Sequence, residues 1–204
     1  MKTVAIVDYG MGNIDSVARA VRELGCRADI TRRPEDFAAA HSLILPGVGA
    51  FGDGMASLRL DGLDQALGEQ VRQGIPTLGI CLGMQLLASE GDEGGVHQGL
   101  GWIQGRVERF VPTEAGERIP HVGWNEVRQA RPSVLFDGIE DGKDFYFVHS
   151  YHFVPGSPEH VLATTPYCGG CVSVVNRDNV YGVQFHPEKS QRVGMRLLQN
   201  FLSL

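Results

Sequence analysis

The stretch that decides the fold is Pro76-Thr77-Leu78-Gly79-Ile80-Cys81-Leu82-Gly83. Its first five residues form a short apolar run that predicts a buried strand, and a helix is expected to begin at Leu82. Glycine stands two residues before and two residues after Cys81, at the junction of strand and helix. This is the pattern of a nucleophile elbow with cysteine in place of serine, in which a crowded turn leaves room only for glycine. We therefore expect the Cys81 sulfur to project from the carboxyl end of a strand.

The position of Cys81 at the start of a helix also predicts its chemistry. The helix dipole favours the thiolate, which is the form that attacks a carbonyl carbon. The N–H of Leu82 points at the same spot and is a candidate oxyanion donor. The alternative is a buried cysteine that only packs at a strand end, as most isolated cysteines do.

Outward from this elbow, short apolar runs alternate with amphipathic stretches. Strands are expected at residues 4–8, 28–31, 43–45 and 76–80, and helices at 14–24, at 63–73 and from 82 onward, with a glycine-rich loop after residue 45. That rhythm predicts parallel strands joined by crossover helices. Continuous apolar runs fit strands that are covered on both faces, as in a doubly wound sheet.

The second half of the chain has closer turns. Strands are expected at residues 145–149, 161–165, 171–176 and 180–185, followed by an amphipathic helix at 191–202. Some of these strands should be antiparallel. Because the chain has 204 residues, no internal repeat and no linker, we expect one domain over residues 1–204.

Composition excludes several functions. The net charge is −6 and charged residues are interspersed, so no basic stripe is available for nucleic acid. The first residues carry no export signal, and no apolar stretch approaches the roughly 20 residues that a bilayer needs, so we expect a soluble cytoplasmic protein with no membrane partner. Four unevenly spread cysteines predict reduced thiols rather than a disulfide framework.

A candidate base for the thiol is found in His186-Pro187-Glu188. Pro187 biases His186 toward an extended conformation, in which residues two apart point to the same side. Glu188 can then hold the imidazole in one tautomer and stabilise the imidazolium. Taken alone, such a pair is usually a solvated turn. Together with the elbow it completes a Cys81, His186 and Glu188 triad.

The pair Cys168 and Cys171 suggests zinc or redox chemistry at first sight. A structural zinc site needs four ligands, and the chain has no second pair of this kind. We therefore assign these cysteines a structural place in a turn, and we expect no metal and no cofactor.

Six segments, in order along the chain, resemble the class I (triad-type) glutamine amidotransferases, and most closely the glutaminase subunits of imidazole glycerol phosphate synthases in that family. They are Asp8–Asn13, Leu45–Gly52, Gly79–Gln85, Pro120–Asn125, His149–Tyr151 and Gly182–Ser190. The resemblance spans nearly the whole chain. It implies a flavodoxin-like α/β fold with a doubly wound, mostly parallel sheet, helices on both faces and additional antiparallel strands in the C-terminal half.

The resemblance further implies hydrolysis of L-glutamine through a thioester on Cys81, with His186 protonating the departing ammonia. The implied partner is a (β/α)8-barrel cyclase subunit in a one-to-one heterodimer. It would use the ammonia to make imidazole glycerol phosphate and aminoimidazole carboxamide ribotide in histidine biosynthesis. The chain has no residues left for a synthetase domain, which also favours a separate acceptor subunit.

The oxyanion loop departs from relatives that place adjacent glycines there, because this chain reads Pro46-Gly47-Val48-Gly49. A β-branched valine resists backbone angles that glycine adopts readily. We expect the oxyanion donors to be Val48, Gly49 and Leu82, and the Gly47-Val48 peptide to flip before it can donate. The alternative is an ordinary strand-to-helix turn.

The resemblance also assigns residues to the substrate pocket, and we choose four further residues as candidates for a docking face. The pocket residues are Gln85, Glu93, His149, Ser150 and Tyr151, with Glu93 expected to pair with the α-ammonium group. The docking residues are Asn13, Trp124, Asn125 and Lys189. Tryptophan is enriched at interface centres, although a single tryptophan is more often in a core.

Two other functions stay open at this point. One is the glutaminase subunit of a different class I synthase, for anthranilate or pyridoxal phosphate, since the triad does not separate these pathways. The other is a non-catalytic thiol sensor on a related fold, which would not need His186 and Glu188 together.

Overall fold

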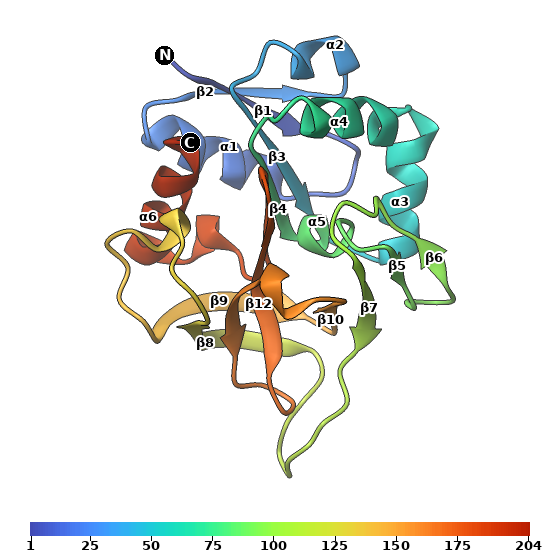
Figure 1. Ribbon diagram of the computed structural model, residues 1–204, viewed down its shortest axis with the longest axis vertical. Helices are drawn as coiled ribbons and strands as arrows, with labels where there is room; N and C mark the ends of the chain where they lie inside the picture. The colour runs from blue at the N-terminus through green and yellow to red at the C-terminus, as the bar shows by residue number, and fades with distance from the viewer.

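A twisted nine-stranded sheet runs through the molecule in the computed structural model, which describes residues 1–204 (Figure 1). One end of the sheet is parallel and runs in the order β2 (Arg27–Thr31), β1 (Thr3–Val7), β3 (Ser42–Gly47), β4 (Thr77–Cys81) and β13 (Val180–Val183). The other end is antiparallel and continues through β12 (Cys171–Arg177), β11 (Val161–Thr165), β8 (His121–Gln129) and β9 (Lys143–His149). The fold class predicted from the sequence is confirmed.

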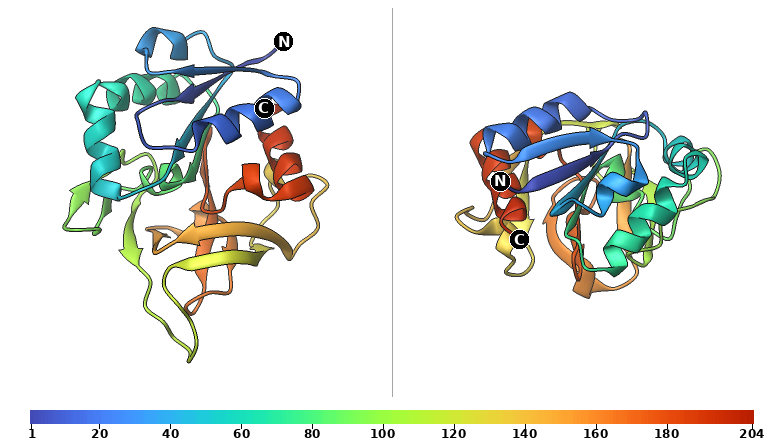
Figure 2. Two further views of the ribbon diagram at one scale, coloured as in Figure 1. Left: turned by 180° about the vertical axis from the view of Figure 1, so that it is seen from behind. Right: turned by 90° about the horizontal axis from the view of Figure 1, so that it is seen from above.

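Helices cover both faces of the parallel strands (Figure 2). Helices α1 (Ile14–Glu23) and α6 (Gln191–Leu202) pack on one face, where Val17, Val21, Leu197 and Phe201 join a single apolar core. The opposite face carries α2 (Pro34–Phe37), α3 (Phe51–Leu60) and α4 (Leu63–Arg72), together with the one-turn helix α5 (Leu82–Gln85). All six residues of β3 and all five of β4 are buried, because they lie between these two helix layers.

A second, four-stranded sheet stands beside the first. Its order is β10 (Tyr151–Pro155), β7 (Gly105–Arg109), β5 (Glu90–Gly91) and β6 (His97–Gln98). Three short 3₁₀ turns complete the chain, at η1 (Val134–Phe136), η2 (Pro158–His160) and η3 (Pro187–Lys189). No helix is long and apolar enough to cross a bilayer.

The expected strands and helices are found within a few residues of their predicted bounds, with one clear error. The glycine-rich segment expected as a loop contains the helix α3. Its glycines are there for packing, since a Cβ on Gly52 would lie 2.8 Å from the His97 ring and one on Gly54 would lie 3.3 Å from Leu82 and Leu86. Close tertiary packing therefore overrides the local turn signal of glycine.

The topology gathers the functional segments at one edge of the sheet. Gly47 and Cys81 are paired at the carboxyl ends of β3 and β4, and β13 lies beside β4. Strand β9 ends at His149, and after Ser150 the chain continues as β10 in the second sheet. The candidate site thus lies at the carboxyl ends of parallel strands, where open α/β sheets bind their ligands.

Candidate active site

Cys81 occupies a strained turn between β4 and α5. Its backbone lies at φ 55° and ψ −111°, which a residue with a side chain rarely adopts. The flanking glycines are sterically required: a Cβ on Gly79 would lie 2.5 Å from the carbonyl oxygen of Gly83, and one on Gly83 would lie 1.8 Å from that of Leu45. The elbow predicted from the sequence is therefore present.

His186 and Glu188 form a buried pair. Nδ1 of His186 lies 2.8 Å from Oε1 of Glu188, and the two side chains are 2% and 1% exposed. His186 has an extended backbone, as expected, but Pro187 begins the turn η3, and this turn brings the Glu188 side chain back to the ring. The expectation that an extended segment carries both residues is wrong. The predicted contact between them is confirmed.

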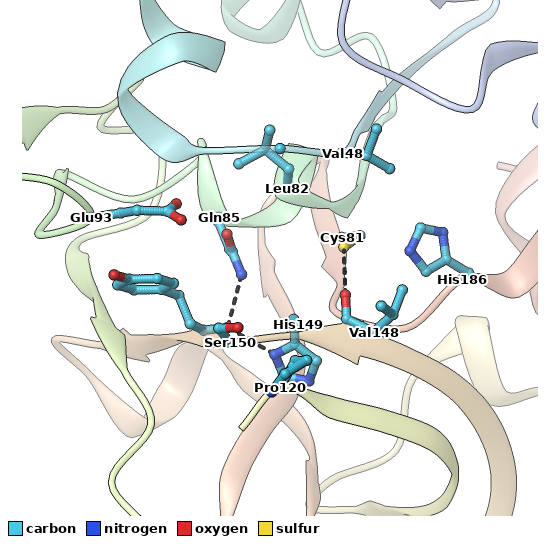
Figure 3. Close-up of a pocket in the computed structure, with 12 residues that line it drawn as sticks. Val48, Cys81, Leu82, Gln85, Glu93, Pro120, Val148, His149, Ser150 and His186 are labelled. Atoms are coloured by element: carbon cyan, nitrogen blue, oxygen red, sulfur yellow. Dashed lines mark hydrogen bonds between the residues drawn. The ribbon is translucent and has the colours of Figure 1, made fainter. Parts of the chain in front are cut away.

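The electrostatics of His186 depend on two neighbours. Burial lowers the pKa of His186, but the nearby Cys81 and the hydrogen-bonded carboxylate of Glu188 outweigh this effect and raise the pKa to about 9. Nε2 of His186 is buried and has no hydrogen-bond partner, and His186 and Cys81 line the same pocket (Figure 3). The free ring nitrogen is thus available to a thiol in that pocket.

The Cys81 sulfur has two polar contacts in the structure. Sγ lies 3.9 Å from the carbonyl oxygen of Val148 and 3.8 Å from Nε2 of Gln184. A thiol can donate its proton to the carbonyl, while the amide of Gln184 donates to the sulfur. Gln184 is fully buried, and sequence reasoning does not single it out.

The pocket has a volume of about 360 Å³, within the range of small-ligand sites. It extends from Glu93 at one end past Cys81 to His186 (Figure 3). Besides Cys81, its lining residues are Val48, Gly49, Leu82, Gln85, Glu93, Pro120, Val148, His149, Ser150, Tyr151 and His186. All the predicted oxyanion and substrate residues therefore meet in one cavity.

In the oxyanion loop, residues 46–49, the N–H of Val48 is already hydrogen-bonded to another backbone group. The N–H of Val48 donates to the carbonyl oxygen of Met11 at 3.2 Å. Gly49 has φ 114°, which favours glycine, and a Cβ there would lie 2.6 Å from Cε of Met11. Leu82 is the first residue of α5, so its N–H has no partner within the helix.

Two of the predicted substrate residues are held firmly by other parts of the site. Nε2 of Gln85 donates to the carbonyl oxygen of Tyr151 at 2.9 Å and to Oε1 of Gln184 at 3.1 Å. Oε2 of Glu93 accepts from the N–H of Phe51 at 2.8 Å, at the first turn of α3. This contact holds the Glu93 carboxylate beside the pocket.

The predicted docking residues lie outside the pocket. Trp124 is 47% exposed and packs edge-on against Tyr146, and Nζ of Lys189 lies 6.0 Å from the centre of the same ring. Asn13 is half-buried where α1 begins. Asn125 is also half-buried, and its side chain contacts His121 rather than solvent alone.

Several residues in or beside the site are not predicted as site residues from the sequence, namely Tyr9, Pro120, Tyr146, Val148 and Gln184. Tyr9 is buried with its hydroxyl unpartnered, and a Cβ on Gly47 would clash with that oxygen. Burial and the nearby Cys81 raise the pKa of Tyr9. Tyr9, Pro120 and Gln184 stand inside the quoted motifs, but their side-chain types carry no catalytic signal of their own.

Cys168 lies in the turn between β11 and β12, as expected, and Cys171 is the first residue of β12. Both are free thiols, and burial raises the pKa of Cys171 to about 12. The N–H of Cys168 donates to Oε1 of Glu117 at 2.7 Å, which fixes the turn. The structure contains no cluster of three or more histidine, cysteine, aspartate or glutamate side chains that could hold a metal ion.

A strained cysteine at a strand-to-helix turn, in one pocket with a histidine that a carboxylate holds, is the arrangement of enzymes that attack a carbonyl carbon with a thiolate. The family described as glutamine amidotransferase class-I matches residues 5–204, and the chain belongs to it. The chain is 50% identical over 201 residues to the imidazole glycerol phosphate synthase subunit HisH of Moorella thermoacetica, covering 98% of this chain and 94% of that one. It is 47% identical over 209 residues to the protein of the same name from Caulobacter vibrioides, covering 99% and 98%.

Solved structures agree on the fold. The structure of PurLQS from Thermotoga maritima matches with a TM-score of 0.75 at 19% identity, covering 99% of this chain and 98% of the other. A glutamine amidotransferase from the same organism matches with a TM-score of 0.66 at 20% identity, covering 96% and 80%. The fold is therefore shared with proteins that are only 19% and 20% identical to this chain.

Proposed function

We propose that this chain is the glutaminase component of an imidazole glycerol phosphate synthase, which hydrolyses L-glutamine and passes the ammonia to a cyclase subunit. The observation that carries the proposal is the strained Cys81 in one pocket with His186, whose far nitrogen is held by Glu188. The relatives that are about half identical over the full chain favour this pathway over anthranilate or pyridoxal phosphate synthesis.

In the proposed reaction, Cys81 gives its proton to Nε2 of His186, and the sulfur attacks the side-chain carbonyl carbon of glutamine. The tetrahedral intermediate collapses when the carbon–nitrogen bond breaks and the imidazolium protonates the leaving nitrogen, which departs as ammonia. Water, deprotonated by the neutral imidazole, then attacks the thioester, and glutamate leaves as the sulfur regains its proton. In this scheme, Nε2 of His186 accepts and donates the proton in every transfer.

The buried Glu188 gives His186 its role in this scheme. A pKa of about 9 means that the imidazolium formed when His186 accepts a proton is stabilised beside the Glu188 carboxylate. Glu188 accepts from Nδ1, so Nε2 is the atom left to exchange protons with Cys81. A non-catalytic thiol sensor has no need for this buried carboxylate.

The oxyanion formed in the first step requires two donors. The N–H of Leu82 at the start of α5 supplies one. Val48 supplies the other only after its N–H leaves the carbonyl of Met11, which accepts it at 3.2 Å in this structure. The resting geometry therefore supports the proposed flip of the Gly47-Val48 peptide. In this proposal, the flip and hence turnover depend on a cyclase subunit that has its nucleotide ligand bound. This flip changes ψ of residue 47 and φ of residue 48, and glycine at position 47 provides part of that freedom.

The rest of the pocket suits the amino-acid end of glutamine. Glu93 places a carboxylate at the end of the cavity away from His186, where it can pair with the α-ammonium group. Gln85, Ser150 and Tyr151 also line the cavity and offer hydrogen bonds to the α-carboxylate. The cavity volume of about 360 Å³ accommodates one amino acid of this size.

An exposed apolar surface lies next to this pocket. Val122 pairs with Val148 and Trp124 pairs with Tyr146 across β8 and β9, and these side chains share one face of the ladder. Val122, Trp124 and Val148 are 56%, 47% and 37% exposed, which is unusual for large apolar side chains so close together. Val148 also lines the pocket. We propose that a (β/α)8-barrel cyclase docks here, one to one, with Asn13 and Lys189 at the rim.

Coexpression with a barrel cyclase tests the pathway. The complex is supplied with glutamine and the phosphoribulosyl carboxamide nucleotide, and glutamate and imidazole glycerol phosphate are measured together. We expect equal amounts of both products, and none from glutamine in Cys81→Ala. If the complex forms glutamate but leaves the nucleotide unchanged, the assignment to this synthase is wrong.

A further inference from the structure

A line of hydrogen bonds runs beneath the pocket from β8 to the start of β10. Asn125 Nδ2 lies 3.2 Å from Nε2 of His121, and Nδ1 of His121 lies 3.1 Å from Nε2 of His149. Nδ1 of His149 lies 2.7 Å from the carbonyl oxygen of Tyr151. Two histidines that the proposed chemistry does not use are thereby joined in series.

Both imidazoles lie in an apolar, aromatic environment. His121 is 3% exposed and stacks between Tyr167, at 3.8 Å between ring centres, and Phe147, at 4.8 Å. His149 is 6% exposed and packs against Phe110, with ring centres 5.0 Å apart. Burial lowers the pKa of His121 to about 4 and that of His149 to about 3. Both rings are therefore neutral at physiological pH.

Neutral rings fix the direction of every hydrogen bond in the line. The carbonyl of Tyr151 can only accept, so His149 carries its proton on Nδ1 and its Nε2 is an acceptor. His121 must then donate from Nδ1, which leaves its own Nε2 to accept from the amide of Asn125. Oδ1 of Asn125 accepts from the N–H of Glu126 at 2.9 Å, which orients that amide. Only one arrangement of protons satisfies the whole line.

The line continues to the nucleophile. The carbonyl of Tyr151 accepts a second hydrogen bond from Nε2 of Gln85, at 2.9 Å. Gln85 in turn donates to Oε1 of Gln184 at 3.1 Å, and Nε2 of Gln184 lies 3.8 Å from Sγ of Cys81. The orientation of Gln85 therefore depends on a carbonyl that His149 holds in place.

We infer that His121 is a positioning residue for glutamine binding. Resting on the proposed function, the inference is that the Nδ1–H of His121 holds His149 in its Nδ1–H tautomer. His149 then fixes the Tyr151 carbonyl and the Gln85 amide that face the substrate. His121 itself does not touch the pocket, because Pro120 before it and His149 beyond it are the residues that line the cavity.

The protonation pattern is tested directly by ¹⁵N NMR of the histidine rings in the complex with the cyclase, at pH 7. We expect His121 and His149 to be neutral and to carry the proton on Nδ1. A proton on Nε2 of either ring overturns the inference. This result does not depend on glutaminase activity, so it separates the inference from the proposed function.

Kinetics of the same complex test the consequence. His121→Phe keeps the aromatic stack on Tyr167 but removes the donor to His149. We expect the KM for glutamine to rise roughly tenfold, as loss of one buried hydrogen bond allows, while kcat changes less than about threefold. His41→Phe is the control, because His41 is exposed and lies just before the amino end of β3, at the opposite edge of the sheet from the site. An unchanged KM in a folded His121→Phe enzyme contradicts the inference, whereas an inactive wild-type complex contradicts the proposed function instead.

A second variant covers the case in which His121→Phe does not fold. Asn125→Asp replaces a hydrogen-bond donor by a carboxylate acceptor, which favours a proton on Nε2 of His121. The donor and acceptor roles of the His121 ring nitrogens are then exchanged. We expect Asn125→Asp to raise the KM for glutamine more than Asn125→Ala does, and its His121 ring to show the Nε2–H form. Equal effects of the two substitutions, with an unchanged tautomer, count against the inference.

Discussion

Oε1 of Glu188 lies 2.8 Å from Nδ1 of His186, and neither side chain is more than 2% exposed. An unpaired buried charge is costly, so each group depends on the other. Pro187 begins the turn that brings them together, which makes the contact a property of the local backbone. The pair therefore sets both the tautomer of His186 and the proton affinity of its free nitrogen.

Glu188→Gln removes the charge but keeps the shape. We expect kcat for glutamine hydrolysis in the complex to fall by roughly 10² to 10⁴, because the imidazolium loses its stabilising carboxylate and the tautomer is no longer fixed. Steady-state glutamate production measures this, with circular dichroism as the check on folding. A variant that folds and keeps its full kcat contradicts the role of Glu188.

The pKa of His186 also predicts how stability depends on pH. The pKa rises from 6.5 to about 9 on folding, so the stabilisation is fully present below pH 6.5 and is lost as pH rises to about 9. Compared with His186→Gln, the wild-type chain should lose on the order of 3 kcal/mol of unfolding free energy across that window. Urea denaturation at several pH values measures the difference.

Cys81→Ala is the control for that experiment. Cys81 contributes to the raised pKa of His186, so its removal should move the pH window to lower values. If the free energy of unfolding changes with pH in the same way for the wild type and His186→Gln between pH 6.5 and 9, this explanation is wrong.

Gly83→Ala tests the elbow. Its new Cβ would lie 1.8 Å from the carbonyl oxygen of Leu45, which the backbone pairing of β3 cannot relieve. We expect a loss of about 3 kcal/mol or more, or no folded protein. Gly68→Ala is the matched control, because it lies in α4 with its nearest neighbour at 3.8 Å, and it should gain about 0.5–1 kcal/mol. Similar urea midpoints for the two variants contradict the steric argument.

Val48→Gly tests the oxyanion loop. The Val48 N–H donates to Met11 at rest, and glycine lowers the barrier for turning that peptide toward Cys81. We expect the variant without its partner to hydrolyse glutamine roughly tenfold faster than the wild type, which corresponds to about 1.4 kcal/mol in activation free energy. The comparison is made without cyclase or nucleotide. If the isolated wild-type chain matches the rate of the loaded complex, the flip is unnecessary.

The sequence predicts the parts of this molecule that local patterns determine. The elbow around Cys81 can be predicted because an apolar strand is followed by a cysteine that has glycine two residues away on each side. The contact between His186 and Glu188 is predicted from their proximity in sequence, although a 3₁₀ turn rather than an extended segment makes it. The strands beside them are apolar runs that indicate burial on both faces. Each of these features can be predicted from residues that are close together in the sequence.

Other parts depend on contacts between distant segments. Helix α3 is not predicted because Gly52 and Gly54 disfavour a helix locally, yet both are needed where His97 and Leu86 approach. Gln184 reaches Cys81 only because β13 lies beside β4, and no feature of a glutamine indicates that. The link from Asn125 to Tyr151 joins three strands and has no sequence signal.

The most direct test is to stop turnover of the cyclase complex with acid and determine the mass of the peptide that contains Cys81. We predict a glutamyl thioester on Cys81 in the presence of glutamine, and neither the adduct nor glutamate formation in Cys81→Ala. Glutamine hydrolysis that continues in Cys81→Ala at the wild-type rate would contradict the account.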